Sequence, residues 1–189
     1  MEIAIFGGSF NPPHLGHAQV LRWLEDQNTP SGAPLFDEVW LIPTHQHAFD
    51  KNLLDFKERL KLCNLLIGDK KLNRVKVKDI EEKIPGKNRI VDTLKHLKKK
   101  FPQEKFTMVL GSDLKKELSS WKEPEKIRKL ADLLFIPRKG YLEKNQKPIA
   151  LEISSSEIRK KIRQEESVKS YLTPAVWNYI KDQKLYHEG

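Results

Sequence analysis

The sequence predicts an α/β fold, a doubly wound parallel sheet with helices on both faces. Two observations predict it. Short apolar runs alternate along the chain with segments whose apolar residues recur at helical spacing, and this strand–helix–strand order repeats. Repeated units of this kind form parallel sheets through right-handed crossovers, and such sheets bind ligands at the carboxyl ends of their strands. The length suits one domain, residues 1–189, with a small C-terminal helical part over 153–189.

The predicted strands are apolar or alternating runs bounded by turn-forming or polar residues. The first run, EIAIF, ends at Gly7-Gly8, and the fourth, KFTMVLGSD, leads into a turn at Gly111. The five expected strands are Glu2–Phe6, Glu38–Pro43, Arg74–Ile80, Lys105–Asp113 and Ala131–Pro137. Segments Asn28–Asp37 and Arg138–Pro148 are rich in turn-forming and polar residues, so we expect them to be surface loops.

The predicted helices carry apolar residues three and four positions apart. In IVDTLKHLKKKF, for example, Ile90 and Leu97 fall on one face. Ser154 and Thr173 are favourable N-cap residues, and Pro174 directly after Thr173 is typical of a helix start. The expected helices are a segment around Val20–Leu24, then Phe56–Ile67, Ile90–Phe101, Ser154–Gln164 and Thr173–Gln183.

The composition indicates a globular protein with a basic surface. Lys and Arg exceed Asp and Glu by nine, which favours anionic partners such as nucleotides. No apolar run approaches the roughly 20 residues needed to span a bilayer, and MEIAIFGG is too short and too acidic for a signal peptide. We therefore expect no membrane partner and a cytoplasmic location. Cys63 is the single cysteine, which excludes a disulfide framework.

The first strand leads into GGSFNPPHLGH. Gly7 and Gly8 allow the backbone to approach a phosphate or nucleoside closely. His14 and His17 stand three apart on a first helical turn, so they share a face near free N–H groups and the positive end of the helix dipole. Gly16 removes a side chain that would block this face. The pattern predicts a cradle for a polyphosphate, whose charge would raise the pKa of both histidines.

Simpler interpretations of this stretch stay open. Its glycines match neither the G-x-G-x-x-G fingerprint nor a Walker A loop, and Gly-Gly after a strand is often a plain turn. The His-x-x-His spacing also occurs at zinc sites, but His45 and His47 are the only nearby histidines that could complete one. We therefore predict no protein-held metal.

A second stretch, ISSSEIR, lies far downstream. Ser154 and Ser155 stand where a helix begins, and Arg159 follows one turn later. The plain interpretation is an N-cap with a helix behind it. The functional interpretation is a second phosphate site made of hydroxyls, N–H groups and the Arg159 guanidinium. Combined with the first stretch, the functional interpretation is the stronger one.

GGSFNPPHLGH together with ISSSEIR resembles the HxGH and ISSxxxR signatures of the nucleotidyltransferase superfamily, whose fold is Rossmann-like. Within it the chain resembles bacterial nicotinate-mononucleotide adenylyltransferases nearly end to end. The segments that carry this closer resemblance are GSDLKKELSSWKEPEKI, DTLKHLKKKFP and YLTPAVWNYIKDQKLYH.

The resemblance implies a reaction. The phosphate of nicotinate or nicotinamide mononucleotide attacks the α-phosphorus of ATP in line, and pyrophosphate leaves. His14 and His17 would be catalytic, holding the ATP phosphates, and Arg159 with Ser154 and Ser155 would grip the β- and γ-phosphates. Mg²⁺ would bridge ATP oxygens, bound mainly through phosphate and water. No general base is expected, because the attacking phosphate is already anionic.

Further roles implied by the resemblance concern the adenosine and the pyridine ring. Asp113 would lie at the ribose hydroxyls. Trp121 would stack on the pyridine ring, unless it is a core anchor. The expected ATP-binding set is Gly7, Gly8, Ser9, Phe10, Gly16, Gly111, Asp113, Ile153, Ser154 and Ser155.

Two segments depart from the family pattern. A PPHK-like stretch is replaced by THQHAFDK, Thr44–Lys51, and a Ser-Tyr-Thr stretch by NRI, Asn88–Ile90. The groups that read the nicotinate carboxylate in the family are thus lost or replaced. Arg89 is a charged substitute, or the amide form is accepted, so the preference stays open. The expected mononucleotide-binding set is Asn11, His45, Lys51, Arg89 and Trp121.

Other functions remain as alternatives. A sister adenylyl- or cytidylyltransferase would act on another phosphate such as phosphopantetheine. A nucleic-acid-binding module would explain the charge, but the chain lacks the aromatic–basic clusters that such a module needs. A truncated class I synthetase-like domain would need a lysine-rich loop that is not visible. We expect ATP and a pyridine mononucleotide as partners and no nucleic acid, and we leave a homodimer open.

Overall fold

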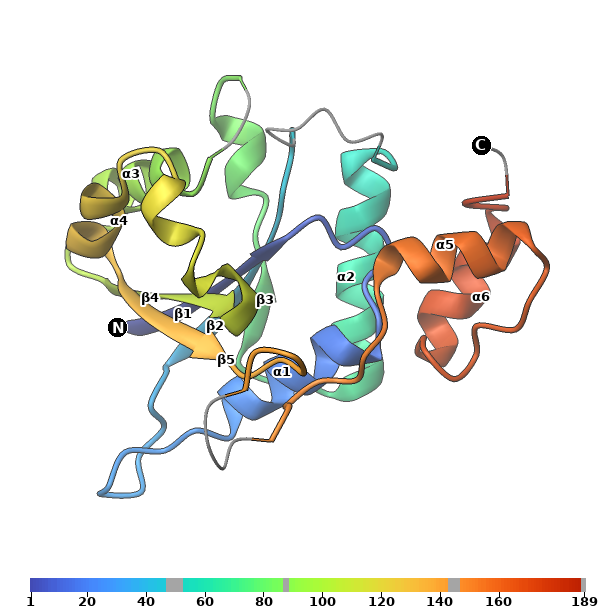
Figure 1. The fold of residues 1–189 in the computed structure, drawn as a ribbon, viewed down its shortest axis with the longest axis horizontal. Coiled ribbons are helices and arrows are strands. Elements are labelled where there is room, and N and C mark those ends of the chain that lie inside the picture. Colours follow the sequence, from blue (N-terminus) through green and yellow to red (C-terminus); the bar gives the residue numbers. More distant parts are fainter. Residues whose placement is uncertain (47–52, 87–88, 143–146, 188–189) are drawn as a thin grey trace.

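The computed structural model is a five-stranded parallel sheet with helices on both faces, which confirms the predicted fold class (Figure 1). It describes residues 1–46, 53–86, 89–142 and 147–187. The strand order is β3-β2-β1-β4-β5. The strands are β1 (Glu2–Gly8), β2 (Glu38–Pro43), β3 (Val75–Val77), β4 (Lys105–Gly111) and β5 (Asp132–Ile136).

Helices cover the sheet in two groups, because alternate strand residues face opposite sides. Ile3 and Ile5 pack with α3 and α4 on one face, whereas Ala4 packs with α1 and α2 on the other. The C-terminal helices extend the second group, and α6 lies against α2. The helices are α1 (Leu15–Glu25), α2 (Phe56–Lys70), α3 (Ile90–Lys100), α4 (Pro124–Leu130), α5 (Ser155–Arg163) and α6 (Pro174–Asp182).

Some expected elements differ from the observed ones. The expected strand Arg74–Ile80 shrinks to β3, because Ile80 starts a short 3₁₀ helix, Ile80–Lys83, that buries its side chain. Helix α4 was not predicted; it is a short helix that places one residue, Ile127, in the core, so its periodicity is weak. Asn28–Asp37 has only an isolated bridge between Asn28 and Pro34, as expected for a loop.

The strand order reverses at β1. The chain builds β2 and β3 on one side of it, and β4 and β5 on the other. The loops that leave β1 and β4 therefore diverge at the carboxyl edge of the sheet and leave a crevice between them. This crevice is where a doubly wound sheet binds its ligand.

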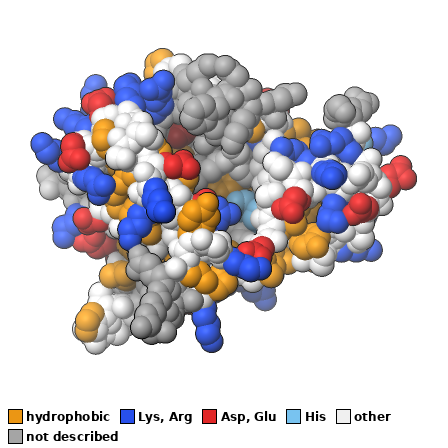
Figure 2. Space-filling view, viewed as in Figure 1, with side chains coloured by type: hydrophobic (Ala, Val, Ile, Leu, Met, Phe, Trp, Pro, Cys, Tyr) orange, Lys and Arg blue, Asp and Glu red, His pale blue; other side chains and the backbone are white. Residues whose placement is uncertain are grey.

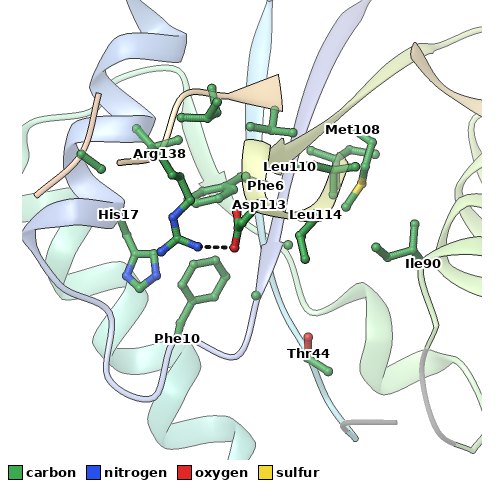
Figure 3. Close-up of a pocket in the computed structure, with 18 of the residues that line it drawn as sticks. Phe6, Phe10, His17, Thr44, Ile90, Met108, Leu110, Asp113, Leu114 and Arg138 are labelled. Atoms are coloured by element: carbon green, nitrogen blue, oxygen red, sulfur yellow. Dashed lines mark hydrogen bonds and ion pairs between the residues drawn. The ribbon is translucent and has the colours of Figure 1, made fainter. Parts of the chain in front are cut away.

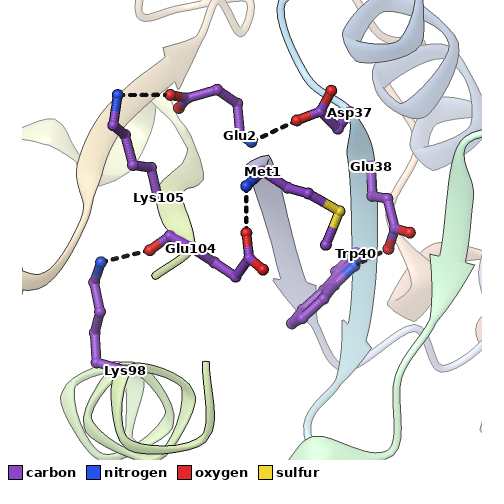
Figure 4. A network of polar contacts seen from close by, with 8 residues as sticks. All are labelled: Met1, Glu2, Asp37, Glu38, Trp40, Lys98, Glu104 and Lys105. Carbon is purple, nitrogen blue, oxygen red and sulfur yellow. Dashed lines mark hydrogen bonds and ion pairs between the residues drawn. The ribbon is translucent and has the colours of Figure 1, made fainter. Parts of the chain in front are cut away.

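The opposite edge is closed by polar contacts (Figure 4). The amino group of Met1 pairs with Glu104, whose carbonyl accepts from Lys98 Nζ at 2.6 Å. Lys105 pairs with Glu2 at 2.9 Å, and the Glu2 N–H donates to Asp37 Oδ2 at 2.8 Å. Each exposed pair contributes little, but together they tie the starts of β1 and β4 to α3 and to the loop before β2.

Among the described residues, no helix has the length and apolar character needed to cross a bilayer.

The two predicted N-caps behave differently. Ser154 Oγ accepts from the Glu157 N–H at 3.1 Å, and Glu157 Oε2 accepts from the Ser154 N–H at 2.9 Å, which completes a capping box. Thr173 precedes α6 as expected, but its side chain makes no cap hydrogen bond. Its Oγ1 is buried without a partner among the described residues.

This contrast predicts opposite effects on stability. Ser154→Ala should lower the free energy of unfolding by about 1 kcal/mol, because the cap is lost. Thr173→Val keeps the side-chain shape and removes an unpaired buried hydroxyl, so it should leave stability unchanged or raise it. Urea unfolding followed by circular dichroism measures both. A clear loss of stability in Thr173→Val would mean that the hydroxyl has a partner.

Candidate functional site

A cavity of about 1210 Å³ opens at the carboxyl edge of the sheet. Gly8 at the end of β1, Thr44 after β2, Gly111 at the end of β4 and Pro137 after β5 all line it. Figure 2 shows this hollow near the middle of the molecule, with histidine atoms visible in it. The volume exceeds that of most small-molecule pockets, so a ligand larger than a mononucleotide fits.

His14 and His17 meet at the start of α1. Their rings are stacked with centroids 3.7 Å apart and an interplanar angle of 30°. The His14 N–H donates to His17 Nδ1 at 3.1 Å, so the neutral His17 ring carries its proton on Nε2. His14 Nδ1 is buried without a partner among the described residues. Stacked rings do not converge on one cation, so this geometry disfavours the zinc alternative.

Both histidines are neutral at neutral pH in the ligand-free protein. Burial, together with the positive charge of Arg138, lowers the pKa of His14 to about 4. Burial also lowers the pKa of His17 well below its usual range, with contributions from His14 and Arg138. In the described part of the chain, no acidic side chain is among the groups that shift these two pKa values, so nothing in the cradle favours the charged form of either histidine. A bound polyphosphate would supply the negative charge that favours it.

Arg138 is a site residue that the sequence analysis assigned to a surface loop. Its Nη1 lies 2.9 Å from Asp113 Oδ2 across the cavity wall, and its N–H donates to Ser112 Oγ at 3.0 Å. Figure 3 shows the guanidinium between Asp113 and the ring of His17. One signal could have found it: Arg138 follows the last residues of a strand in a parallel sheet, where ligands bind.

Gly111 permits the close approach of these two side chains. A methyl group there would lie 2.2 Å from Asp113 Oδ1 and 2.8 Å from Arg138 Cδ, far inside contact distance. Gly16 also serves packing, because a methyl group there would lie 3.1 Å from the His14 ring and from the Leu151 carbonyl oxygen. The space beside Gly16 is thus filled by protein, and is not open as the sequence analysis expected.

The second motif lies beside the first, although more than 130 residues separate them in sequence. Ser155 Oγ donates to the Pro12 carbonyl at 2.8 Å, and Arg159 Nη1 donates to the Asn11 carbonyl at 2.6 Å. Ser154 and Ser155 line the cavity, whereas Arg159 lies behind the loop and does not line it. The Ser154 hydroxyl is used in the cap, so the plain interpretation holds for that side chain.

Most of the expected ATP-binding residues gather at this end of the cavity. Ser9 is the exception, because its carbonyl faces Arg59 Nη1 at 2.9 Å. The expected residues that line the cavity are Gly7, Gly8, Phe10, Gly16, Gly111, Asp113, Ile153, Ser154 and Ser155.

The other end of the cavity is mainly apolar. Ile90, Leu110 and Leu114 face it in Figure 3. Trp121 and Arg89 line it as expected. Trp121 is half-buried and packs against the core on the α3 side, so it is partly the anchor that the simpler interpretation foresaw.

Two described residues of the expected mononucleotide-binding set do not line this end. Asn11 is buried, and its Oδ1 accepts from Tyr186 Oη at 2.9 Å. The ring of His45 packs edge-on against Phe56, with centroids 4.9 Å apart. Lys51 lies outside the described residues.

Glu81 is a polar residue of this end that sequence reasoning missed. It is buried and lines the cavity. Its carboxylate accepts from Thr93 Oγ1 at 2.8 Å and from the His45 N–H at 3.2 Å. Burial raises the pKa of Glu81. No periodicity marks such a residue, because its burial follows from the turn after β3.

Comparisons with known proteins agree with this geometry. Residues 5–161 match the family model described as cytidylyltransferase-like. A relative from Anaeromyxobacter dehalogenans, named as a probable nicotinate-nucleotide adenylyltransferase, is 33% identical over 98% of this chain and 96% of its own. The chain belongs to the nicotinate-nucleotide adenylyltransferase family.

Solved structures support the same family. A Plasmodium falciparum nicotinic acid mononucleotide adenylyltransferase complexed with NaAD superimposes with a TM-score of 0.84, at 27% identity, over 98% of this chain and 97% of that one. The same enzyme complexed with APC gives 0.81 at 25% identity, over 98% and 96%. The expected family, fold and enzyme class are thus confirmed, and the named relatives decide against the sister transferase.

The lowered histidine pKa predicts how stability depends on pH. Between pH 6.5 and about 4 the unfolded chain binds a proton that buried His14 does not, so unfolding becomes easier as pH falls. The full contribution of His14, about 3 kcal/mol, is present above pH 6.5. His14→Gln should therefore flatten the pH dependence of the unfolding free energy in this window, measured by urea unfolding at each pH. An unchanged slope would show that His14 is not buried as a neutral ring.

Proposed function

We propose that the chain transfers AMP from ATP to nicotinate mononucleotide, forming nicotinate adenine dinucleotide and pyrophosphate in NAD biosynthesis. One observation carries the proposal. A single cavity has the stacked histidines at the start of α1 at one end and the aromatic, apolar wall with Trp121 at the other. Its volume suits two nucleotides side by side. The family members named above act on or bind molecules of this kind.

The reaction needs alignment more than acid–base chemistry. A phosphate oxygen of the mononucleotide attacks the α-phosphorus of ATP, the bond to the β-phosphate oxygen breaks, and pyrophosphate leaves with the electron pair. The attacking oxygen is already anionic, so no base is required. His17 Nε2–H and the N–H groups at the start of α1 donate to the phosphates, and the developing charge raises the histidine pKa values. Arg138 adds positive charge beside them.

Asp113 and Gly111 would bind the adenosine, with the ribose hydroxyls donating to the Asp113 carboxylate. Ser155 and Arg159 would act through the loop that they contact, and the N–H groups at the start of α5 would face the outer phosphates. These roles remain proposals. A cytoplasmic location and the one-domain organisation likewise stay predictions, and a homodimer stays an open alternative.

The side chains of the site fit a metal ion that is bound by ATP and not by the protein alone. No group of three His, Cys, Asp or Glu side chains in the described ranges could hold an ion. The Asp113 carboxylate is paired with Arg138, and Glu81 is engaged by Thr93 and His45. We therefore propose that Mg²⁺ is coordinated mainly by ATP oxygens and water. When bound, it supplies charge neutralisation at the phosphates.

The assay that tests the function also tests substrate choice. The protein is mixed with ATP, Mg²⁺ and either nicotinate or nicotinamide mononucleotide, and pyrophosphate is followed. We expect a higher kcat/KM for the acid form, because Arg89 places a cation at that end of the cavity. Arg89→Met should reduce the acid-to-amide ratio about tenfold, whereas Lys99→Met, on the exposed last turn of α3, should not. No release with either mononucleotide would refute the function; an unchanged ratio in Arg89→Met would refute only the role of Arg89.

His17→Ala should lower kcat by about 10²–10³-fold, because a donor to the transition-state charge is lost. The fold should persist, as judged by circular dichroism. His96→Ala is the matched control, since His96 lies on α3 and does not line the cavity. Full activity in His17→Ala would contradict the phosphate-cradle role.

A further inference from the structure

The loop between β1 and α1, residues Ser9–Pro13, leads directly into the histidine pair at the start of α1 and contains no helix or strand. Residues 10–13 are buried, and carbonyl groups of buried residues need donors. The donors come from side chains of distant elements. The Ser9 carbonyl accepts from Arg59 at 2.9 Å, the Asn11 carbonyl from Arg159 at 2.6 Å, and the Pro12 carbonyl from Ser155 at 2.8 Å.

Arg59 connects this loop to the rest of the cavity rim. It lies on α2 and is 1% exposed. Besides the Ser9 carbonyl, its guanidinium donates to the carbonyls of Thr44 at 2.7 Å and Leu54 at 2.9 Å. One buried cation thus joins the loop after β1 to the segments after β2 and before α2.

Asn11 receives a further contact from the far end of the chain. Its side chain is 2% exposed, and Oδ1 accepts both from the Leu54 N–H at 3.3 Å and from Tyr186 Oη at 2.9 Å. Tyr186 follows α6, and 175 residues separate it from Asn11. In Figure 1 the chain leaving β1 turns back beside the start of α5, so the C-terminal part lies next to this loop.

We propose that Tyr186 is a positioning residue for adenylyl transfer, acting through the side chain of Asn11 on the loop that presents His14 and His17. The inference rests on the proposed function. Asn11 is held from three directions: by Arg159 on α5, by the Leu54 N–H, and by the Tyr186 hydroxyl. Only the last depends on residues beyond α6, so the segment after α6 helps to set the place of the phosphate cradle.

The consequence is kinetic. A reaction catalysed by alignment loses rate steeply when groups shift by fractions of an ångström, while ground-state binding changes less. Loss of the Tyr186 hydroxyl should therefore lower kcat with little change in KM. A merely structural contact would lower the melting temperature and leave kcat of the folded protein unchanged.

Tyr186→Phe in the full chain tests this proposal, with Tyr179→Phe as the matched control. The Tyr179 hydroxyl donates to Glu58 Oε2 at 3.0 Å and ties α6 to α2 without contacting the loop. Each variant loses one hydrogen bond, so both should melt about 2–4 °C lower. Tyr186→Phe should lower kcat for pyrophosphate release about tenfold, with both KM values within about twofold. Tyr179→Phe should keep the wild-type kcat.

A second variant, Asn11→Ala, and a second measurement, NMR of the histidine rings, test the same proposal independently. Asn11→Ala removes the acceptor, so it should lower kcat at least as much, and adding Tyr186→Phe to it should cause no further loss. In NMR spectra, Tyr186→Phe should shift the ring signals of His14 and His17, and Tyr179→Phe should not. All assays run at a temperature at which circular dichroism shows each variant folded.

The outcomes separate cleanly. Wild-type protein inactive with both mononucleotides would refute the proposed function, whatever the histidine signals show. Active wild-type protein with unchanged kcat and unchanged histidine signals in Tyr186→Phe would refute the positioning role. Losses that multiply in the double variant would also refute it, because the two residues would then act independently.

Discussion

The structure depends on how the loop after β1 satisfies its own buried carbonyl groups. A ligand-binding loop has to leave N–H groups for the ligand, so its carbonyls need donors from elsewhere. Arg59, Arg159 and Ser155 each serve one carbonyl of the loop. Arg59 also donates to the carbonyls of Thr44 and Leu54, because a guanidinium has several donors in one plane and can serve several carbonyls at once. The cost of burying that charge is offset by these hydrogen bonds. The histidines, the cavity rim and the start of α2 all take their places from this arrangement.

Burial and charge act in opposite directions at the histidine pair. Desolvation and the nearby Arg138 keep both rings neutral in the ligand-free protein. The same desolvation strengthens any interaction with an anion, because little water remains to screen it. His14, His17 and Arg138 disfavour positive charge on one another, but each of them interacts favourably with a phosphate. This supports a mechanism of charge stabilisation and alignment, without a nucleophile or a base.

The sequence predicted the sheet well and the site partly, for physical reasons. Apolar runs mark buried parallel strands directly, so β2 was predicted to the residue. The two motifs were expected to meet and do meet, through Ser155 and Arg159. Arg138 and Glu81 were missed, because polar residues in loops carry no periodic signal. Contacts such as Tyr186 with Asn11 join residues far apart in the chain, and no local pattern encodes them.

The pairing of Asp113 with Arg138 has a consequence for measured affinity. In the ligand-free protein each side chain is already the other's counter-charge. A nucleotide that draws Arg138 Nη1 or Asp113 Oδ2 away from its partner replaces a contact that exists, so binding through these atoms is an exchange of partners. Its apparent affinity is then a difference between two sets of interactions, and it reports on the ligand-free state as much as on the complex. Salt weakens the exposed pair as well as the contacts to the ligand, so the two effects of ionic strength partly cancel.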